Sequence, residues 1–268
     1  MRINKLLATL TFSLLFSNAV AANYNNAYET YISKDYKAAF KEMLPYAREG
    51  HVDAQYWVAE MYRDGNGIQE NLPAALQWFT NSAEQGDKWA QQQVGWMYDT
   101  GQGVLENDKT AVKWYTLAAE QGHSTAQNNL GVMYSNGNGV PENDKTAVKW
   151  YTLAAEQGHS TAQFNLGFMY QYGNGVPEND KTAVKWYTKV AEQGHGKAQT
   201  NLGFMYQYGE GVLTNYRRAY MWYNLGSYNG NELGGENKDK LAKEMTPADL
   251  SKAQDMSSQC LESNYTDC

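Results

Sequence analysis

The stretch from His123 to Gly158, HSTAQNNLGVMYSNGNGVPENDKTAVKWYTLAAEQG, is followed at once by a near copy of itself. The copy, residues 159–194, differs from the first stretch at six of its thirty-six positions. The same interval separates a longer series of glycines: Gly50, Gly86, Gly122, Gly158, Gly194 and Gly230. A fixed period of this length is typical of stacked supersecondary units, so we predict a repeat protein. The full repeats are 51–86, 87–122, 123–158, 159–194 and 195–230.

Each repeat is expected to begin with a helix and a tight turn. In the quoted stretch Ser124 can cap this helix, in which apolar residues recur at intervals of three and four. The helix should end near Asn136. Gly137 and Gly139 then allow positive φ angles, and Pro141 prevents the helix from continuing.

A second helix completes the repeat. Asp144 is predicted to cap it, and Gly158 to end it in the left-handed conformation. Between them lies an apolar stripe at helical spacing: Ala147, Trp150, Tyr151 and Ala154. Gly131 lies inside the first helix, where glycine costs about 1 kcal/mol relative to alanine. We therefore expect close packing there, with Ala147 and the ring of Trp150 against the bare glycine.

One such helix pair cannot bury its apolar face alone, so neighbouring pairs must stack. The predicted fold is an all-α, right-handed α/α superhelical solenoid of helix pairs. Residues 22–50 are expected to form an N-terminal capping half-repeat. Residues 231–268 should supply C-terminal capping helices, one of which starts at Thr246-Pro247.

Residues 1–21 have the pattern of a cleavable bacterial signal peptide. Basic residues precede a short apolar run from Leu6 to Phe16, and a small-x-small cleavage site follows at Ala19–Ala21. We therefore expect a periplasmic or secreted protein. In such an oxidising compartment the two cysteines, Cys260 and Cys268, can form a local disulfide.

Composition and motifs argue against several function classes. The chain has 22 basic and 29 acidic residues, a net charge of −7, which disfavours nucleic acid as a partner. All four histidines share one repeat position: His51, His123, His159 and His195. Successive repeats should lie about 10 Å apart, whereas the ligands of one zinc ion each lie about 2.0 Å from it. No hydrolase motif such as Gly-x-Ser-x-Gly occurs, so we expect no enzyme, metal or cofactor.

The first helix of each repeat has a second face, opposite its core face, which we predict to be concave and ligand-binding. Its three positions read Trp57, Gln93, Asn129, Asn165, Asn201; then Glu60, Trp96, Val132, Phe168, Phe204; then Asp64, Thr100, Asn136, Tyr172, Tyr208. The predicted binding residues are Gln93, Trp96, Asn129, Val132, Asn165, Phe168, Tyr172, Asn201, Phe204 and Tyr208. An amide side chain donates and accepts hydrogen bonds at once, so a row of amides suits an extended peptide backbone. Alternatively, the asparagines only bridge adjacent helices and the aromatic rings only pack between repeats.

The repeat also resembles a known family. The pattern Leu130-Gly131…Tyr134…Gly137-x-Gly139-Val140…Asp144-Lys145…Ala147…Trp150…Ala154-Ala155…Gly158 is similar to the Sel1-like repeat, a relative of the tetratricopeptide repeat. The resemblance runs from Ala54 to Gly230 and implies a helical solenoid used as an adaptor, often in bacterial envelope or host-interaction proteins. In tetratricopeptide repeats the asparagine before Leu-Gly commonly contacts the ligand backbone, and three residues stand in that place: Asn129, Asn165 and Asn201. Trp57 and Gln93 depart from this pattern. The chain also lacks the disulfide that secreted cysteine-rich members carry within each repeat.

Three hypotheses for the function follow. The first is a monomeric, non-enzymatic scaffold or adaptor of the bacterial envelope that binds an extended peptide or protein segment on its concave face. The alternative is a glycan- or peptidoglycan-binding envelope protein, because 21 tyrosines and eight tryptophans offer rings that can stack on sugars. A catalytic role is the third, and it would require a cleft with a set of titratable side chains that the repeats do not share.

Overall fold

The computed structural model describes residues 24–266 and Cys268, so the predicted signal peptide, residues 1–21, lies outside the described residues. Across the described residues the chain is all-helical and contains no β-strand. The predicted all-α architecture of paired helices is therefore confirmed. The chain divides between His123 and Ser124 into two compact units.

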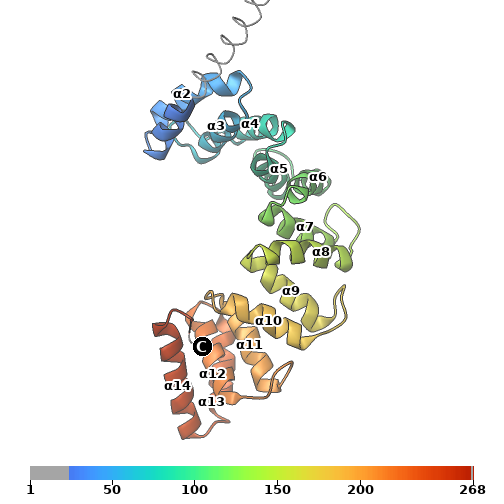
Figure 1. Cartoon of the computed structure of the whole chain (residues 1–268), viewed down its shortest axis with the longest axis vertical. Helices are drawn as coiled ribbons and strands as arrows, with labels where there is room; N and C mark the ends of the chain where they lie inside the picture. The colour runs from blue at the N-terminus through green and yellow to red at the C-terminus, as the bar shows by residue number, and fades with distance from the viewer. Residues whose placement is uncertain (1–23, 267) are drawn as a thin grey trace, which may run out of the picture. The chain divides into compact units, whose positions relative to one another are not determined.

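The first unit begins with helical residues 24–32. The helices that follow are α2 (Tyr36–Arg48), α3 (Val52–Asp64), α4 (Leu72–Glu84), α5 (Lys88–Thr100) and α6 (Asp108–Glu120) (Figure 1). Each of these helices packs against the next one along the chain. The unit is thus a stack in which sequence neighbours are also neighbours in space, as expected of a repeat array.

The second unit contains eight helices among its described residues. They are α7 (Ser124–Asn136), α8 (Asp144–Glu156), α9 (Ser160–Tyr172), α10 (Asp180–Ala191), α11 (Gly196–Tyr208), α12 (Tyr216–Tyr228), α13 (Glu232–Ala242) and α14 (Pro247–Glu262). Helices α7 to α13 pack in order, and α14 folds back onto α12. No helix between residues 24 and 266 is both long and apolar enough to cross a membrane.

The turns within the repeats form as predicted. Helix α7 ends at Asn136, and the next turn places Gly137 at φ 72° and Gly139 at φ 68°. Gly158, after α8, has φ 87°. Such angles are strained for any residue with a Cβ atom, which explains why glycine recurs at these positions.

The helix caps lie one residue earlier than predicted. Helix α8 is capped by Asn143, whose side chain accepts a hydrogen bond from the Thr146 N–H at 3.0 Å. Asp144 is the first helical residue, where its negative charge opposes the positive end of the helix dipole. Ser124 is likewise the first residue of α7 and not its cap. At the equivalent boundary of α9 the cap is His159.

The close contact predicted at the helix glycine exists, but the ring belongs to a different residue. A Cβ atom on Gly131 would lie 2.6 Å from Cε1 of Tyr151, so Tyr151 and not Trp150 fills the space left by the missing side chain. The same contact joins Gly167 to Tyr187. Trp150 is half-buried, whereas Tyr151 is buried.

A buried glutamine joins each of several repeats to the helix before it, and the sequence analysis did not identify this role. Gln163 donates from Nε2 to the Ala155 carbonyl oxygen at 3.0 Å, and its Oε1 accepts from Gln193 at 3.4 Å. We call this arrangement the glutamine bridge. It recurs at Gln55, Gln91 and Gln199.

The C-terminal helix covers the end of the second unit. Thr246 caps α14 as predicted, accepting a hydrogen bond from the Asp249 N–H at 3.2 Å. Ala253 and Cys260 are fully buried on the face of α14 that contacts the core. A disulfide joins Cys260 to Cys268. The N-terminal end is covered by α2 and residues 24–32, which share one apolar cluster with α3.

Candidate functional site

In the second unit, the predicted binding residues lie on the first helices of successive repeats. We call this set the aromatic–amide row. It comprises eight predicted binding residues: Asn129 and Val132 on α7, Asn165, Phe168 and Tyr172 on α9, and Asn201, Phe204 and Tyr208 on α11. We add Asn136 on α7, which lies at the repeat position of Tyr172 and Tyr208 but was not among the predicted binding residues. Each helix presents these residues three or four positions apart, a spacing that keeps them on one side of the helix.

 A cavity joins α7 to α9 along this row. Its volume is ≈ 320 Å³. The row contributes residues from both helices to its wall: Val132, Asn136, Asn165 and Phe168. The structure therefore brings together three predicted binding residues, Val132, Asn165 and Phe168, with Asn136 beside them. The wall is completed by Ser135, Tyr151, Phe164 and Met169, which the sequence analysis did not select.

The aromatic members of the row form two equivalent pairs. The ring centroids of Phe168 and Tyr172 lie 4.5 Å apart, and those of Phe204 and Tyr208 are also 4.5 Å apart. All four rings are exposed to solvent, at 41%, 57%, 37% and 60% in chain order. Since large apolar side chains are usually withdrawn from water, the repeated exposed pair is a candidate interaction surface.

Two asparagines of the row, Asn129 and Asn165, are linked by hydrogen bonds through Asn128. Asn165 on α9 donates a hydrogen bond to Oδ1 of Asn128 on α7 at 3.3 Å, and Asn128 donates to Asn129 at 3.3 Å. This chain of amides bridges two helices, as the alternative interpretation expected. It uses one of the two N–H groups of Asn165, so a bridging role leaves capacity for a ligand.

The corresponding positions of the first unit have different surroundings. The ring of Trp57 packs against Tyr31 at 4.8 Å and against Tyr28 at 5.5 Å. Gln93 donates to Glu60 at 3.4 Å, and Glu60 also forms a bidentate ion pair with Arg63. Burial is the main reason that the pKa of the Glu60 carboxyl is raised. Trp96 packs against the core of α3 to α5.

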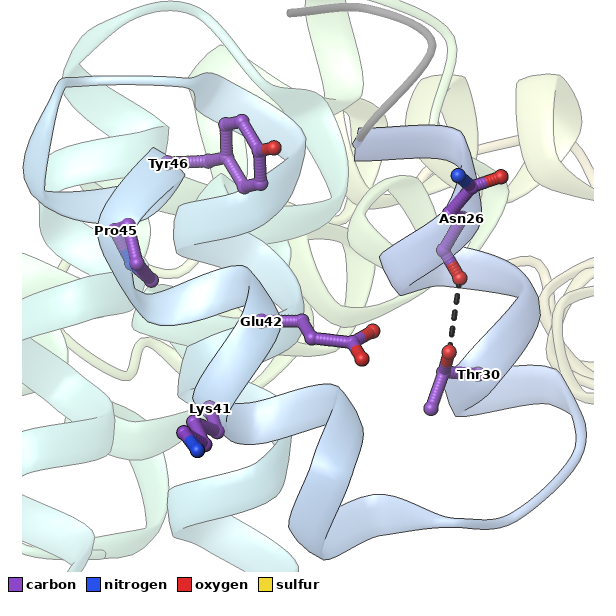
Figure 2. Close-up of a pocket in the computed structure, with 6 residues that line it drawn as sticks. All are labelled: Asn26, Thr30, Lys41, Glu42, Pro45 and Tyr46. Atoms are coloured by element: carbon purple, nitrogen blue, oxygen red, sulfur yellow. Dashed lines mark hydrogen bonds between the residues drawn. The ribbon is translucent and has the colours of Figure 1, made fainter.

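A cavity of ≈ 430 Å³ lies between residues 24–32 and α2, at the N-terminal end of the described chain. Figure 2 shows Glu42 pointing from α2 toward Asn26 and Thr30, with Lys41 and Tyr46 on the same helix. The hydroxyl of Thr30 donates to the Asn26 carbonyl oxygen at 3.0 Å. The lining carries one cation and one anion, a mixture that specifies no single class of ligand.

Across the described residues these features define an all-helical repeat protein with equivalent exposed Phe–Tyr pairs on α9 and α11. A family model described as the Sel1 repeat matches residues 52–87, 90–123, 124–159, 160–195 and 196–231. The chain belongs to the Sel1 repeat family. Proteins of this family generally mediate protein–protein interaction, and the fold is typically a non-catalytic scaffold.

Two solved structures from bacteria are similar to this chain. A Sel1 repeat protein from Oxalobacter formigenes is 33% identical with a TM-score of 0.77, over 86% of this chain and 96% of the other. The second, c5321, is described as a protective antigen of uropathogenic Escherichia coli strains. It is 30% identical with a TM-score of 0.57, and the match covers 86% of this chain and 58% of c5321. No curated protein matches the chain.

Proposed function

We propose that this protein is a non-enzymatic scaffold of the bacterial envelope that binds an extended protein segment along the aromatic–amide row. The observation that carries the proposal is the repeated, solvent-exposed Phe–Tyr pair on α9 and α11. Aromatic side chains are the commonest sources of binding energy in protein interfaces. Identical pairs on successive repeats suit a ligand that runs past one repeat after another.

The combination of aromatic and amide positions suits a peptide. The two rings of each pair are inclined to one another at 49° and 48°, so a pair is not one continuous flat platform. Its apolar ring surface suits an apolar side chain, and the amides of the row can bind the backbone on either side of that side chain.

The envelope location rests on two features of the sequence. Residues 1–21 have the pattern of a signal peptide, and Cys260 is disulfide-bonded to Cys268. Disulfides persist in oxidising compartments such as the bacterial periplasm. The location can be tested by fractionating cells and sequencing the N-terminus of the mature protein, which we expect to follow Ala21.

The binding surface is tested most cleanly through the aromatic pairs. Substitution of Asn165 would leave the buried Asn128 amide without its partner on α9, so a loss of binding could follow from altered structure. The combined variant Phe168→Ala, Tyr172→Ala, Phe204→Ala and Tyr208→Ala removes only exposed rings. We expect unchanged helical content and a loss of affinity for captured periplasmic partners of at least about 100-fold.

A matched control is available in the same unit. Tyr216 and Tyr228 on α12 are exposed at 43% and 71% and lie outside the row. The variant Tyr216→Ala with Tyr228→Ala should retain its partners. Equal capture by both variants would reject the row as the binding surface. Sedimentation with purified cell wall, lost in the four-residue variant, would instead support the glycan-binding alternative.

A further inference from the structure

The first unit contains a cavity of ≈ 300 Å³ that shares no residue with the aromatic–amide row, which lies in the second unit. Three aromatic and two acidic side chains line it: Asp53, Tyr56 and Trp57 from α3, and Asp87 and Trp89 from the start of α5. We propose that this cavity, which we call the acidic aromatic cavity, binds an organic cation such as a quaternary ammonium or a guanidinium group. The proposal is independent of the function proposed for the second unit.

The lining matches what such a cation needs. Aromatic ring faces attract ammonium and guanidinium groups, most strongly when the ring is tryptophan. The rings of Tyr56 and Trp57 meet edge to face, with centroids 5.1 Å apart and planes at 86°, so they present two differently oriented surfaces. Trp89 is 54% exposed, which leaves much of its ring open to a ligand.

The charge of the cavity points to the same class of ligand. Asp53 and Asp87 supply two carboxylates. Asp87 caps α5 by accepting a hydrogen bond from the Ala90 N–H at 2.6 Å, through one of its two oxygens. The neighbouring Lys88 ammonium lies 5.9 Å from the centroid of the Trp89 ring. One lysine against two carboxylates leaves a net negative charge, which favours a cation and disfavours an anion.

The repeats themselves supply an internal comparison. Where this cavity has Trp89, the next two repeats have Thr125 and Thr161. Asp87 likewise takes the place that histidine occupies in the other four repeats: His51, His123, His159 and His195. Asp87 and Trp89 thus both differ from the residues at the same positions in other repeats, and both line one cavity. Unrelated surface substitutions would not be expected to cluster in this way.

The cavity is better suited to binding than to catalysis. Its titratable groups are the two carboxylates and the Tyr56 phenol, and Asp87 is held as a helix cap. Burial raises the pKa of Tyr56, so this phenol keeps its proton at neutral pH. The lining contains no serine, cysteine or histidine that could serve as a nucleophile or base.

The test uses the full mature chain and measures binding of small cations at constant ionic strength. Choline and N-acetylarginine amide are titrated by calorimetry, with 3,3-dimethylbutan-1-ol as the uncharged isostere of choline. We expect saturable binding of at least one cation, at least about tenfold tighter than binding of the alcohol. Preference for choline would indicate a free small molecule, and preference for the arginine derivative would indicate a basic side chain of a peptide.

The variants follow from the repeat comparison. Asp53→Thr with Trp89→Thr installs the residues that stand at this position in the third and fourth repeats, and both native side chains are exposed. This variant should bind the cation at least about tenfold more weakly. Leu105→Ala, at an 89% exposed position of the same unit, should bind as the native chain does. No saturable binding of either cation, or binding of both cations no tighter than that of the uncharged alcohol, would overturn the proposal.

Discussion

At the scale of the residue, Gly167 and Tyr187 determine how closely two helices of one repeat approach each other. Alanine normally stabilises a helix interior relative to glycine by about 1 kcal/mol. A Cβ atom on Gly167 would lie 2.8 Å from Cε1 of Tyr187, a fully buried ring whose hydroxyl donates to Gln171 at 2.9 Å. We therefore expect Gly167→Ala to lower the free energy of unfolding by about 1–3 kcal/mol.

Chemical denaturation monitored by circular dichroism measures this change. The control is the same substitution in a Tyr187→Ala background, where the ring is absent and the additional cost should disappear. A gain in stability from Gly167→Ala in the native background would contradict the packing described here.

A second residue-scale prediction concerns the glutamine bridge. Gln199 is fully buried, donates to the Ala191 carbonyl oxygen at 2.9 Å and accepts from Asn229 at 2.9 Å. Gln199→Leu installs an apolar side chain of similar size and removes the hydrogen bonds to both partners. The Ala191 carbonyl still accepts from the Gly194 N–H, and Asn229 still donates to Leu225 and Tyr265. We therefore expect the free energy of unfolding to fall by about 1–3 kcal/mol, because two hydrogen bonds of about 0.5–1.5 kcal/mol each are lost. Gln254→Leu, at an exposed position of α14, should change it little, and an equal effect of both would argue against the bridge.

Residue roles were the least predictable part of the fold. Both Asn143 and Asp144 are good helix caps, so composition alone could not decide between them. Trp150 and Tyr151 are adjacent, about 100° apart around the helix, and either ring could have faced Gly131. The glutamine bridge depends on pairing between side chains thirty residues apart, a distance over which helical periodicity carries no information.

At the scale of the element, histidine caps make the first helices of two repeats sensitive to pH. Nδ1 of His159 accepts from the Ala162 N–H at 3.3 Å, and Nδ1 of His195 accepts from Ala198 at 3.2 Å. Burial lowers the pKa of both imidazoles. Protonation would also convert the accepting nitrogen into a donor and abolish the cap.

The sign of the effect follows from linkage. Because the unfolded chain binds protons more readily at these histidines, their contribution to stability is complete above the unfolded pKa of about 6.5. It is lost as the pH falls through the lowered folded pKa. We expect the variant His159→Asn with His195→Asn to keep both caps through the amide oxygen and to lose less stability than the native chain between pH 7 and pH 5. Parallel stability curves for the two proteins would contradict this role.

The elements themselves could be predicted well from the sequence. The three- and four-residue spacing, the glycine turns and the thirty-six-residue period placed the end of α7 at Asn136. The Thr246-Pro247 pair placed the start of α14 at Pro247. These signals succeed because each helix pair depends on local periodicity and on its nearest neighbours alone. The extra packing of Trp57 against Tyr28 and Tyr31 was not predicted, because residues 24–32 lie outside the repeat pattern.

At the scale of the whole molecule, the sequence identified the class of protein and a surface, but not the local contacts of that surface. The identity of the row positions follows from helical geometry, and the exposure of the Phe–Tyr pairs agrees with it. The acidic aromatic cavity was missed because its residues come from two repeats and depart from the residues found in the later repeats. Comparing the same position in each repeat identifies a surface that recurs from repeat to repeat, such as the aromatic–amide row. A site that occurs once is formed by residues that differ from the repeat pattern, so this comparison does not identify it.

The central claim, that an extended segment runs along the aromatic–amide row, is tested most directly by site-specific photo-crosslinking. A photoreactive phenylalanine analogue replaces Phe168 in one protein and Phe204 in another, with position 228 as the control. Successive repeats lie about 10 Å apart, and an extended chain advances about 3.3 Å per residue. We predict that positions 168 and 204 link to one partner at residues about three apart, as mass spectrometry of the linked peptides would reveal. Links to unrelated sites, or a yield no higher than at position 228, would contradict the claim.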